Sequence, residues 1–444
     1  MPLKDKEYVL KSAKDNNVKF IRLWFTDILG FLKSFAITIK ELEVTLDEGA
    51  GFDGSSIEGF VRIDESDMMA MPDMNTWEIL PWRHNEESTV ARIFCDIQTP
   101  EGEPYDGDPR GVLRRNLKRA EDLGYKFYVG PELEFFYFKS SEGTPEPLDK
   151  GGYFDLTPLD LASDFRKKTV EALDALGIDV ETSHHEVGPS QHEIDLRYTD
   201  ALTMADNAMT YRLVVKEVAL RNNVYATFMP KPLYGENGSG MHVHMSLFKG
   251  ERNAFYDASD KHHLSDLAKR YIAGLIKHAP EFTLITNQWV NSYKRLVPGY
   301  EAPIYTTWAV RNRSDMIRIP AYKLGKENAT RIELRSPDPA CNPYLAFSAM
   351  LAAGLEGIEK NYPIIEPVER NVYNLSEEER KELNIGTLPG DLYEAIKMME
   401  PSQVIKKALG HHVFHSLLEN KKLEWADYRT QLSDWEMKNY FPIL

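Results

Sequence analysis

The stretch Gly130-Pro131-Glu132-Leu133-Glu134-Phe135-Phe136-Tyr137-Phe138 alternates acidic and apolar side chains. A period of two predicts a β-strand in which Glu132 and Glu134 share one face, while the odd-numbered apolar residues share the other. Two carboxylates held side by side in so apolar a strand raise one another's pKa unless a cation lies between them. This stretch therefore predicts a strand that carries chemistry on one face.

Other segments show the same arrangement, with ionisable or hydroxyl side chains on one face and aliphatic ones on the other. Residues 184–197 are predicted to form a strand, a Gly-Pro turn and a second strand, and a glycine-rich loop precedes the strand at 241–247. The residues on the polar faces are Glu186 and Glu193 beside the turn, His242, His244 and Ser246 in 241–247, Arg331, Glu333 and Arg335 in 331–335, and Arg318 in 317–319.

Any one such segment is also explained as a half-buried antiparallel strand with a solvated polar face. That alternative weakens when the segments are taken together. Solvated faces usually mix in Lys, Thr, Ser and Gln, whereas these faces hold Glu, His and Arg almost exclusively. The pattern favours the inner lining of a curved sheet.

These faces offer mainly hard oxygen ligands and no thiolate, which favours Mg²⁺ or Mn²⁺ over zinc or copper. Six side chains are enough for two or three ions: Glu132, Glu134, Glu186, Glu193, His242 and Glu333. Arginines beside such metals suit phosphate oxygens, which guanidinium groups bind bidentately. Metal, arginine and carboxylate together indicate phosphoryl transfer.

Three loops add polar groups to this picture. Residues 291–303 suit a mobile flap with Glu301 at its tip, and residues 311–314 contribute further arginines. In the turn at residues 51–59, Asp53 is most simply explained as an Asx-type cap of its own backbone. The sequence has no Walker A motif and no G-x-G-x-x-G after a strand, so an ATP site must be of another type.

The order of these patterns predicts an α+β protein. The first hundred residues alternate in short strand-like segments, and three prolines and two glycines in residues 99–109 mark a boundary. Beyond it, Asp108 as N-cap, Pro109 at the first helical position and Gly124 past the end predict a helix. Further helices are expected at about 163–177, 203–222, 265–278 and 343–361. We therefore expect a small domain at residues 16–100 and a larger one at residues 108–444.

Composition limits the classes of partner. The chain has 444 residues and a formal charge of -16, which disfavours nucleic acid and anionic lipid as direct ligands. Its two cysteines lack metal-ligand spacing. The N-terminus lacks a basic segment followed by an apolar core, and no window approaches a membrane span. We expect a cytoplasmic protein.

Several long motifs, in this order, resemble the bacterial type I glutamine synthetase family. They are Phe52-Asp53-Gly54-Ser55-Ser56, Gly130 to Phe136, His185-Glu186-Val187, Lys231 through His242, and Asn291 to Pro303. The resemblance runs from about residue 16 to the C-terminus. It implies a β-grasp N-terminal domain, a catalytic domain with a curved antiparallel sheet flanked by helices, and a dodecamer of two stacked hexameric rings whose active sites lie between adjacent subunits.

The resemblance also implies a division of labour among the residues. Glu134, Glu186 and Glu193 would hold one metal, and Glu132, His242 and Glu333 the other. The groups assigned to substrates are, for glutamate, Asn237, Gly238, Arg295 and Arg335, and for ATP, Glu181, His244, Ser246, Arg318 and Arg331.

The reaction implied is amidation of glutamate by ammonia through γ-glutamyl phosphate, giving glutamine, ADP and phosphate. Arg313 and the metals would neutralise the transferring phosphoryl group. Asp53 from the neighbouring subunit and Glu301 match the residues that bind and deprotonate ammonium, and Glu301 would shield the acyl phosphate from water.

Some features favour the feedback-inhibited, alpha-type branch of the family. Arg62 occupies the position of an arginine that helps to sense glutamine, and that branch also binds transcription regulators of nitrogen metabolism. Tyr373 matches the tyrosine that the other branch adenylylates, but the segment between Phe138 and Gly151 is too short for that branch's insertion. Residues 323–330 depart from the ATP-side sequences of the family.

Two alternatives remain at this point. A paralogous ligase on the same fold would amidate glutamate with a polyamine or another amine, although Asp53, as an ammonium-binding acid, argues against it. A non-catalytic ring serving as a scaffold predicts gaps in the ligand set, and all six predicted ligands are present.

Overall fold

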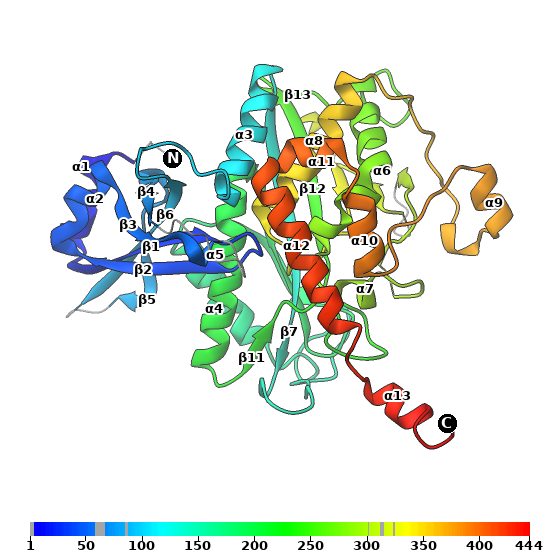
Figure 1. The fold of residues 1–444 in the computed structure, drawn as a ribbon, viewed down its shortest axis with the longest axis horizontal. Coiled ribbons are helices and arrows are strands. Elements are labelled where there is room, and N and C mark those ends of the chain that lie inside the picture. Colours follow the sequence, from blue (N-terminus) through cyan, green and yellow to red (C-terminus); the bar gives the residue numbers. More distant parts are fainter. Residues whose placement is uncertain (1–3, 58–66, 85–87, 301, 311–314, 323–324) are drawn as a thin grey trace.

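The computed structural model describes residues 4–57, 67–84, 88–300, 302–310, 315–322 and 325–444. Two sheets organise these residues (Figure 1). The N-terminal sheet and its helices lie to one side of the molecule, and the larger sheet is flanked by helices on the other side. The fold is therefore α+β, with a β-grasp domain first and a catalytic domain with a curled sheet after it, as predicted.

In the described residues the first sheet has six strands in the order β2-β1-β6-β4-β3, with β5 paired to β6. The strands are β1 (Val18–Thr26), β2 (Leu32–Thr38), β3 (Ala50–Asp53), β4 (Asp67–Pro72), β5 (Glu78–His84) and β6 (Thr89–Gln98). Helices α1 (Lys6–Asp15) and α2 (Leu42–Glu48) belong to the same domain. β1 and β6 run parallel, and the other pairs are antiparallel.

Alternation along β1 gives this sheet two buried faces. Ile21 and Leu23 point into a core that includes residues of α1 and α2. Trp24, on the opposite face, packs edge-on against Phe94 and belongs to the large core shared with the catalytic domain. The same strand thus builds the small domain and attaches it to the large one.

Helix α3 (Pro109–Asp122) follows the proline-rich boundary and connects the domains. The Asp108 carboxylate accepts the Arg110 N–H, as an N-cap does, and also the Ile97 N–H of β6. The Arg110 guanidinium is buried and lies between Asp73 and Asp96 of the first domain and Asp206 of the second. This ion-pair network fixes the orientation of the two domains.

The second sheet has ten strands within the described part of the chain, in the order β14-β15-β16-β12-β7-β9-β8 with three short strands at its margins. The strands are β7 (Lys126–Phe138), β8 (Val180–His185), β9 (Gln191–Leu196), β10 (Thr199–Asp200), β11 (Tyr225–Thr227), β12 (Met241–Lys249), β13 (Arg252–Asn253), β14 (Trp308–Val310), β15 (Ile317–Ile319) and β16 (Ile332–Leu334). All pairings are antiparallel except β14 with β15.

Helices complete the catalytic domain, and their apolar faces supply most of the large core. They are α4 (Ser163–Asp174), α5 (Ala201–Arg221), α6 (Asp266–Thr286), α7 (Ser292–Arg295), α8 (Pro343–Glu359), α9 (Glu377–Glu382), α10 (Leu392–Met399), α11 (Gln403–Leu409), α12 (His411–Tyr428) and α13 (Asp434–Asn439). The last of them, α13, extends away from the body with the C-terminus (Figure 1).

One helix is longer than the sequence predicts. The pattern places its end near residue 278, yet α6 continues through Pro280 to Thr286. Proline costs this helix one hydrogen bond, but Phe282, Leu284 and Ile285 beyond it are buried in the core, and this burial outweighs the cost. No helix among the described residues is both long and apolar enough to cross a bilayer.

Candidate active site

Strand register gathers the predicted ionisable residues on one face of the second sheet. Across β7 and β9, Glu132 pairs with Asp195 and Glu134 with Glu193. His242 of β12 lies opposite Glu132, and His244 lies opposite Glu333 of β16. Four neighbouring strands therefore present their polar faces to one another at sheet spacing.

Most of these side chains line a cavity of about 540 Å³. Its predicted members are Glu132, Glu134, Glu186, Glu193, Asn237, Gly238, His242, Arg295, Arg318 and Arg335. The cavity thus combines glutamate carboxylates, a histidine and guanidinium groups in one polar space. Glu333 lies beside it, fully buried, with its oxygens held by Arg318 and, at 2.6 Å, by Arg335 Nη1.

Glu132, His242 and Glu333 form one possible metal site, because one ligand atom from each lies within 4.8 Å of the others. His242 Nδ1 is 3.2 Å from Glu132 Oε2 and 3.8 Å from Glu333 Oε1. Burial raises the pKa of Glu132, but His244 and His242 outweigh it and lower that pKa well below its usual value. Glu132 is therefore ionised at neutral pH and can serve as a metal ligand.

A second group contains Glu134, Glu186 and Glu193. Burial, and after it the nearby charge of Glu186, raise the pKa of Glu134 to about 8. Burial, together with Asp195 and the other glutamates, also raises the pKa of Glu193 well above its usual value. The protein alone therefore does not neutralise this concentration of carboxylates.

Two buried carboxylate oxygens on this face have no hydrogen-bond partner among the described residues. They are Glu193 Oε1 and Asp195 Oδ1. Buried carboxylate oxygens are normally hydrogen-bonded or bound to metal. Oxygen-rich ligands with one imidazole suit Mg²⁺ or Mn²⁺, so the donor set fits hard divalent cations.

A smaller cavity of about 210 Å³ lies next to the first and shares Glu132 and Asp195 with it. Four of the residues assigned to ATP line it: Glu181, His244, Ser246 and Arg331. Arg331 Nε donates to His244 Nδ1 at 3.2 Å, and His244 Nε2 is 2.7 Å from Glu132 Oε1. This hydrogen-bonded chain connects the two cavities. Asn328, Ala329 and Thr330, from the segment that departs from the family, also line the smaller cavity.

All four residues assigned to glutamate line the larger cavity. Gly238 is required there, because a Cβ atom on it would lie 2.3 Å from the Pro230 carbonyl oxygen and 3.0 Å from Arg295. Arg295 is buried and donates to the main-chain carbonyls of Ser336, Pro337 and Arg335. Its guanidinium therefore also anchors the loop that follows β16.

The remaining predicted residues lie elsewhere. Asp53 is exposed at the end of β3, where its Oδ1 accepts the Ser55 N–H at 3.0 Å, in the Asx-type turn anticipated for it. It is absent from the lining of either cavity as described. Arg62, Glu301 and Arg313 lie outside the described residues.

Some lining residues were missed by the sequence analysis. His184 Nε2 lies 2.8 Å from Glu186 Oε1 and 3.2 Å from Glu193 Oε2, and Asp195 lines both cavities. Both follow the period-two pattern of their strands, so a stricter count would have found them. Tyr153 and Phe154 come from a loop, and Tyr198 follows the end of β9, where no such pattern exists.

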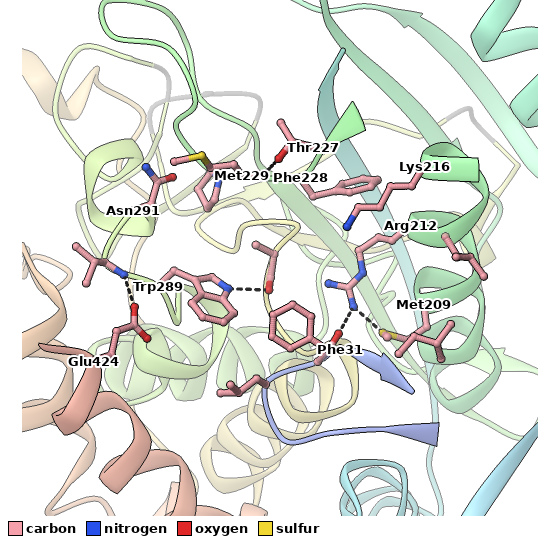
Figure 2. Close-up of a pocket in the computed structure, with 17 residues that line it drawn as sticks. Phe31, Met209, Arg212, Lys216, Thr227, Phe228, Met229, Trp289, Asn291 and Glu424 are labelled. Atoms are coloured by element: carbon pink, nitrogen blue, oxygen red, sulfur yellow. Dashed lines mark hydrogen bonds between the residues drawn. The ribbon is translucent and has the colours of Figure 1, made fainter. Parts of the chain in front are cut away.

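A further cavity, of about 640 Å³, is mostly apolar and lies between the β1–β2 turn, α5 and the segment around Trp289 (Figure 2). Its arginine is already bound: Arg212 donates to the carbonyls of Gly30, Pro339 and Cys341. Glu424 accepts the Val290 N–H at 3.2 Å. This cavity lacks the converging carboxylates of the polar site.

The chain matches family models and relatives of known proteins over almost its whole length. A family model of the glutamine synthetase catalytic domain matches residues 106–440, and one of the glutamine synthetase β-grasp domain matches residues 17–100. The chain is 52% identical to a glutamine synthetase of Mycolicibacterium smegmatis over 99% of this chain and 100% of that protein. It is 53% identical to one of Methanosarcina mazei over 99% of this chain and 98% of that protein.

Solved structures give the same result for the fold. A GmaS–ADP complex superimposes with a TM-score of 0.89 at 31% identity, covering 99% of this chain and 100% of that one. The cryo-EM structure of Plasmodium falciparum glutamine synthetase gives a TM-score of 0.88 at 25% identity, with 99% of each chain covered.

Proposed function

The chain belongs to the glutamine synthetase family, the ATP-dependent glutamate–ammonia ligases, and from that membership we propose how its residues divide the reaction. The larger cavity takes glutamate and the divalent cations, and the smaller one takes ATP. The observation that carries this assignment is the wall of Glu132 and Asp195 that the two cavities share. A γ-phosphoryl group entering from one side meets a carboxylate held on the other. The domains proposed for this division are residues 16–100 and 108–444.

Two sets of side chains in the larger cavity and beside it are the proposed metal ligands. Glu132, His242 and Glu333, whose ligand atoms lie within 4.8 Å of one another, would hold one ion. Glu134, Glu186 and Glu193 would hold another, giving two or three Mg²⁺ or Mn²⁺ ions per site. Bound there, divalent cations would supply positive charge that neutralises the transferring phosphoryl group. His184 and Gln191 position the ligands, since Gln191 Nε2 donates to Glu134 Oε2 at 2.7 Å.

Arginines bind the anionic parts of the substrates. Arg335, with Arg295, Asn237 and Gly238, receives the carboxylates of glutamate, while Arg318 and Arg331 face the phosphates. Glu181, His244 and Ser246 complete the nucleotide side. The ADP complex of GmaS, which shares this fold, is consistent with a nucleotide on this architecture.

The chemistry follows from charge. A carboxylate is a poor acceptor for ammonia, so ATP first phosphorylates it to γ-glutamyl phosphate, which has a good leaving group. Arg313 stabilises the transferring phosphoryl group. Asp53 binds ammonium and Glu301 accepts its proton and excludes water from the acyl phosphate. Ammonia then displaces phosphate to give glutamine.

Asp53 supports an assembly in which sites are shared. It is exposed and does not line the polar cavity of its own chain, so we propose that a neighbouring subunit supplies it. The loop after β7 reaches that cavity with Tyr153 and Phe154. This loop exposes several apolar side chains, and such surfaces are typical of subunit contacts: Tyr153, Phe154, Leu156, Leu159 and Leu161. The proposed assembly is a dodecamer of two hexameric rings in the cytoplasm. We also propose feedback inhibition through Arg62 and contacts with regulators of nitrogen metabolism.

The test is phosphate release from ATP with Mg²⁺ and glutamate, with and without ammonium, for wild type and Asp53→Ala. We expect ammonium-dependent turnover that falls at least a hundredfold in the variant. Methylamine and a polyamine serve as alternative amines. Turnover with these amines but not with ammonium would contradict the proposal and favour the paralogous ligase, and no turnover with any amine would favour the scaffold.

A further inference from the structure

Asp149 is a buried aspartate to which the proposed reaction gives no role. It is 7% exposed and is absent from the lining of the polar cavity as described. It lies in the loop after β7, four and five residues before Tyr153 and Phe154, which do line that cavity. A buried carboxylate is costly unless it is hydrogen-bonded, so its partners show what it holds together.

The Asp149 carboxylate joins two segments of the chain. Its Oδ1 accepts the Ser190 N–H at 2.9 Å, in the turn between β8 and β9, and its Oδ2 accepts the Leu161 N–H at 3.0 Å. The Asp149 N–H donates in return to Ser190 Oγ at 2.9 Å. One side chain thus closes the loop at residues 149–161 and fastens it to the β8–β9 turn.

His185 connects the same carboxylate to a proposed metal ligand. Its Nε2 lies 3.0 Å from Asp149 Oδ1, and its Nδ1 lies 2.7 Å from the Glu186 carbonyl oxygen. A carbonyl oxygen and an ionised carboxylate only accept hydrogen bonds, so both ring nitrogens donate. His185 is therefore a buried imidazolium paired with Asp149, and it holds the main chain of Glu186 in place.

This group of side chains is not a further metal site. Asp149, His185 and His192 do bring possible ligand atoms within 4.8 Å of one another. However, Arg166 Nη1 donates to His192 Nδ1 at 2.9 Å, so the proton of His192 is on Nε2. Neither imidazole has a lone pair left for a cation, and the group serves to hold the chain instead.

Two residues at these contacts have backbone conformations that need support. Ser190 has a φ of 56° and Phe154 a φ of 62°, although neither is glycine. Such conformations persist only where surrounding contacts impose them. Asp149 provides these contacts to Ser190, and the His185 carbonyl provides one to Phe154, whose N–H it accepts at 3.0 Å. The loop and the turn are therefore held against their local preference.

We propose that Asp149 is a positioning residue, which through His185 holds Glu186 as a metal ligand and keeps the loop of Tyr153 and Phe154 beside it. The proposal rests on the assignment of Glu186 to an ion in the proposed function. Residues that hold metal ligands from behind commonly change metal affinity by about 10–100-fold when they are removed.

The second proposed ligand set provides a comparison within the same site. Glu132, His242 and Glu333 belong to β7, β12 and β16, outside the loop and the turn that Asp149 joins. Loss of Asp149 should therefore weaken one metal site and spare the other. A general loss of structure would weaken both.

The experiment titrates the full-length protein with Mn²⁺ by calorimetry, with free Mn²⁺ followed by electron paramagnetic resonance. Asp149→Ala should weaken one site at least tenfold and leave the other within about twofold of wild type. Asp149→Asn, which keeps one acceptor oxygen, should show a smaller loss at the same site. Asp155→Ala is the matched control, because Asp155 lies in the same loop but accepts the Gly152 N–H at 2.8 Å, within that loop. It should bind Mn²⁺ as wild type does.

Glu186→Gln identifies the site concerned. It should weaken the same site as Asp149→Ala, and the two losses should not add in the double variant, because both act on one ligand. If Glu186→Gln weakens a site and Asp149→Ala does not, the positioning role is wrong and the metal assignment stands. If Glu186→Gln weakens no site, the metal assignment fails and the positioning role fails with it. Equal weakening of both sites by Asp149→Ala would also overturn the proposal.

Gly151→Ala provides an independent test should Asp149→Ala fail to fold. A Cβ atom on Gly151 would lie 2.7 Å from His185 Nε2, so it displaces the imidazole from Asp149 while the carboxylate remains. This variant should weaken the same Mn²⁺ site at least threefold. Unchanged Mn²⁺ binding in a folded Gly151→Ala protein would overturn the proposal.

Discussion

Glu134 is buried, and the charges of Arg295 and Arg335 nearby do not offset the cost of burying its carboxylate. Its Oε2 accepts N–H groups from Gln191 and Gly240, yet burial and then the charge of Glu186 raise its pKa to about 8. The metal-free fold therefore holds a proton here that the unfolded chain, with the usual glutamate pKa near 4.5, releases. Between these two values the metal-free protein loses stability as pH rises. A divalent cation reverses that penalty because it replaces the proton.

The affinity for Mn²⁺ should accordingly rise with pH. Metal binding needs the ionised carboxylate, so binding below the folded-state pKa releases a proton. For each proton released, the affinity increases about tenfold per pH unit. We expect Mn²⁺ titrations by calorimetry to show tighter binding at pH 7.5 than at pH 6.5. The heat should also depend on the ionisation enthalpy of the buffer, since protons are released. Equal affinity at both pH values, with no buffer dependence, would contradict this account.

Tyr198 is placed to stack against a nucleotide base. It lines the smaller cavity, is 53% exposed and contacts Tyr128 edge-on, so its ring is available for an adenine base. Stacking of a base on an aromatic ring contributes about 1–3 kcal/mol. Tyr198→Ala should therefore raise the KM for ATP by about tenfold or more with little change for glutamate, whereas Tyr198→Phe should behave as wild type. Steady-state kinetics separate these outcomes, and an equal rise for both substrates would show a general distortion instead.

Residues of this kind also mark the limit of sequence reasoning. Glu132 and Glu134 could be placed on one face because a strand has a fixed period, and the structure puts them on neighbouring positions of β7 facing β9 and β12. Tyr153 reaches the same cavity from a loop, whose path depends on tertiary contacts. Asx chemistry predicted the turn at Asp53, but no local signal shows which cavity Asp53 serves.

At the scale of elements, the crossing of α6 and α8 depends on glycine. A Cβ atom on Gly357 would lie 2.1 Å from the Arg270 carbonyl oxygen, and one on Gly274 would lie 2.2 Å from the Ala353 carbonyl oxygen. Both obstacles are backbone atoms of the facing helix, so neither can rotate away. These helices support the core under the second sheet, and the sequence predicted their existence but not this close approach.

Gly357→Ala should therefore destabilise the protein even though alanine favours helix. Overpacking costs between about 1 and 3 kcal/mol, and replacing glycine by alanine in a helix gains about 1 kcal/mol. Because the obstacle here is rigid backbone, we expect a cost near the upper end of its range, which exceeds the gain. We expect a lower midpoint in denaturant unfolding. Gly51→Ala is the control, because its Cβ would meet only the Met69 sulfur at 3.8 Å. A variant as stable as wild type would mean that the helices separate without cost.

At the scale of the whole molecule, the α+β order and both sheets could be predicted, because short strand patterns precede a long alternation of helices and strands. The extension of α6 past Pro280 could not, since its cause is burial of residues far apart in the sequence. The bridge from Arg110 to Asp73, Asp96 and Asp206 was equally hidden. That bridge holds β3, and hence Asp53, at a fixed position relative to the catalytic sheet of its own chain.

A fixed, outward-facing Asp53 makes the shared-site assembly testable by complementation. Asp53→Ala removes a group donated to a neighbour, whereas Glu333→Gln disables the cavity of its own chain. Each variant alone should be inactive. When the two are dissociated, mixed and reassembled in equal amounts, a site is intact only where a Glu333→Gln subunit donates its Asp53 to an Asp53→Ala subunit, which is roughly a quarter of all sites for cyclic contacts. Ammonium-dependent turnover should thus return to about a quarter of the wild-type value. If each cavity used the Asp53 of its own chain, no mixture could restore activity, because every chain would carry one defect in its own site.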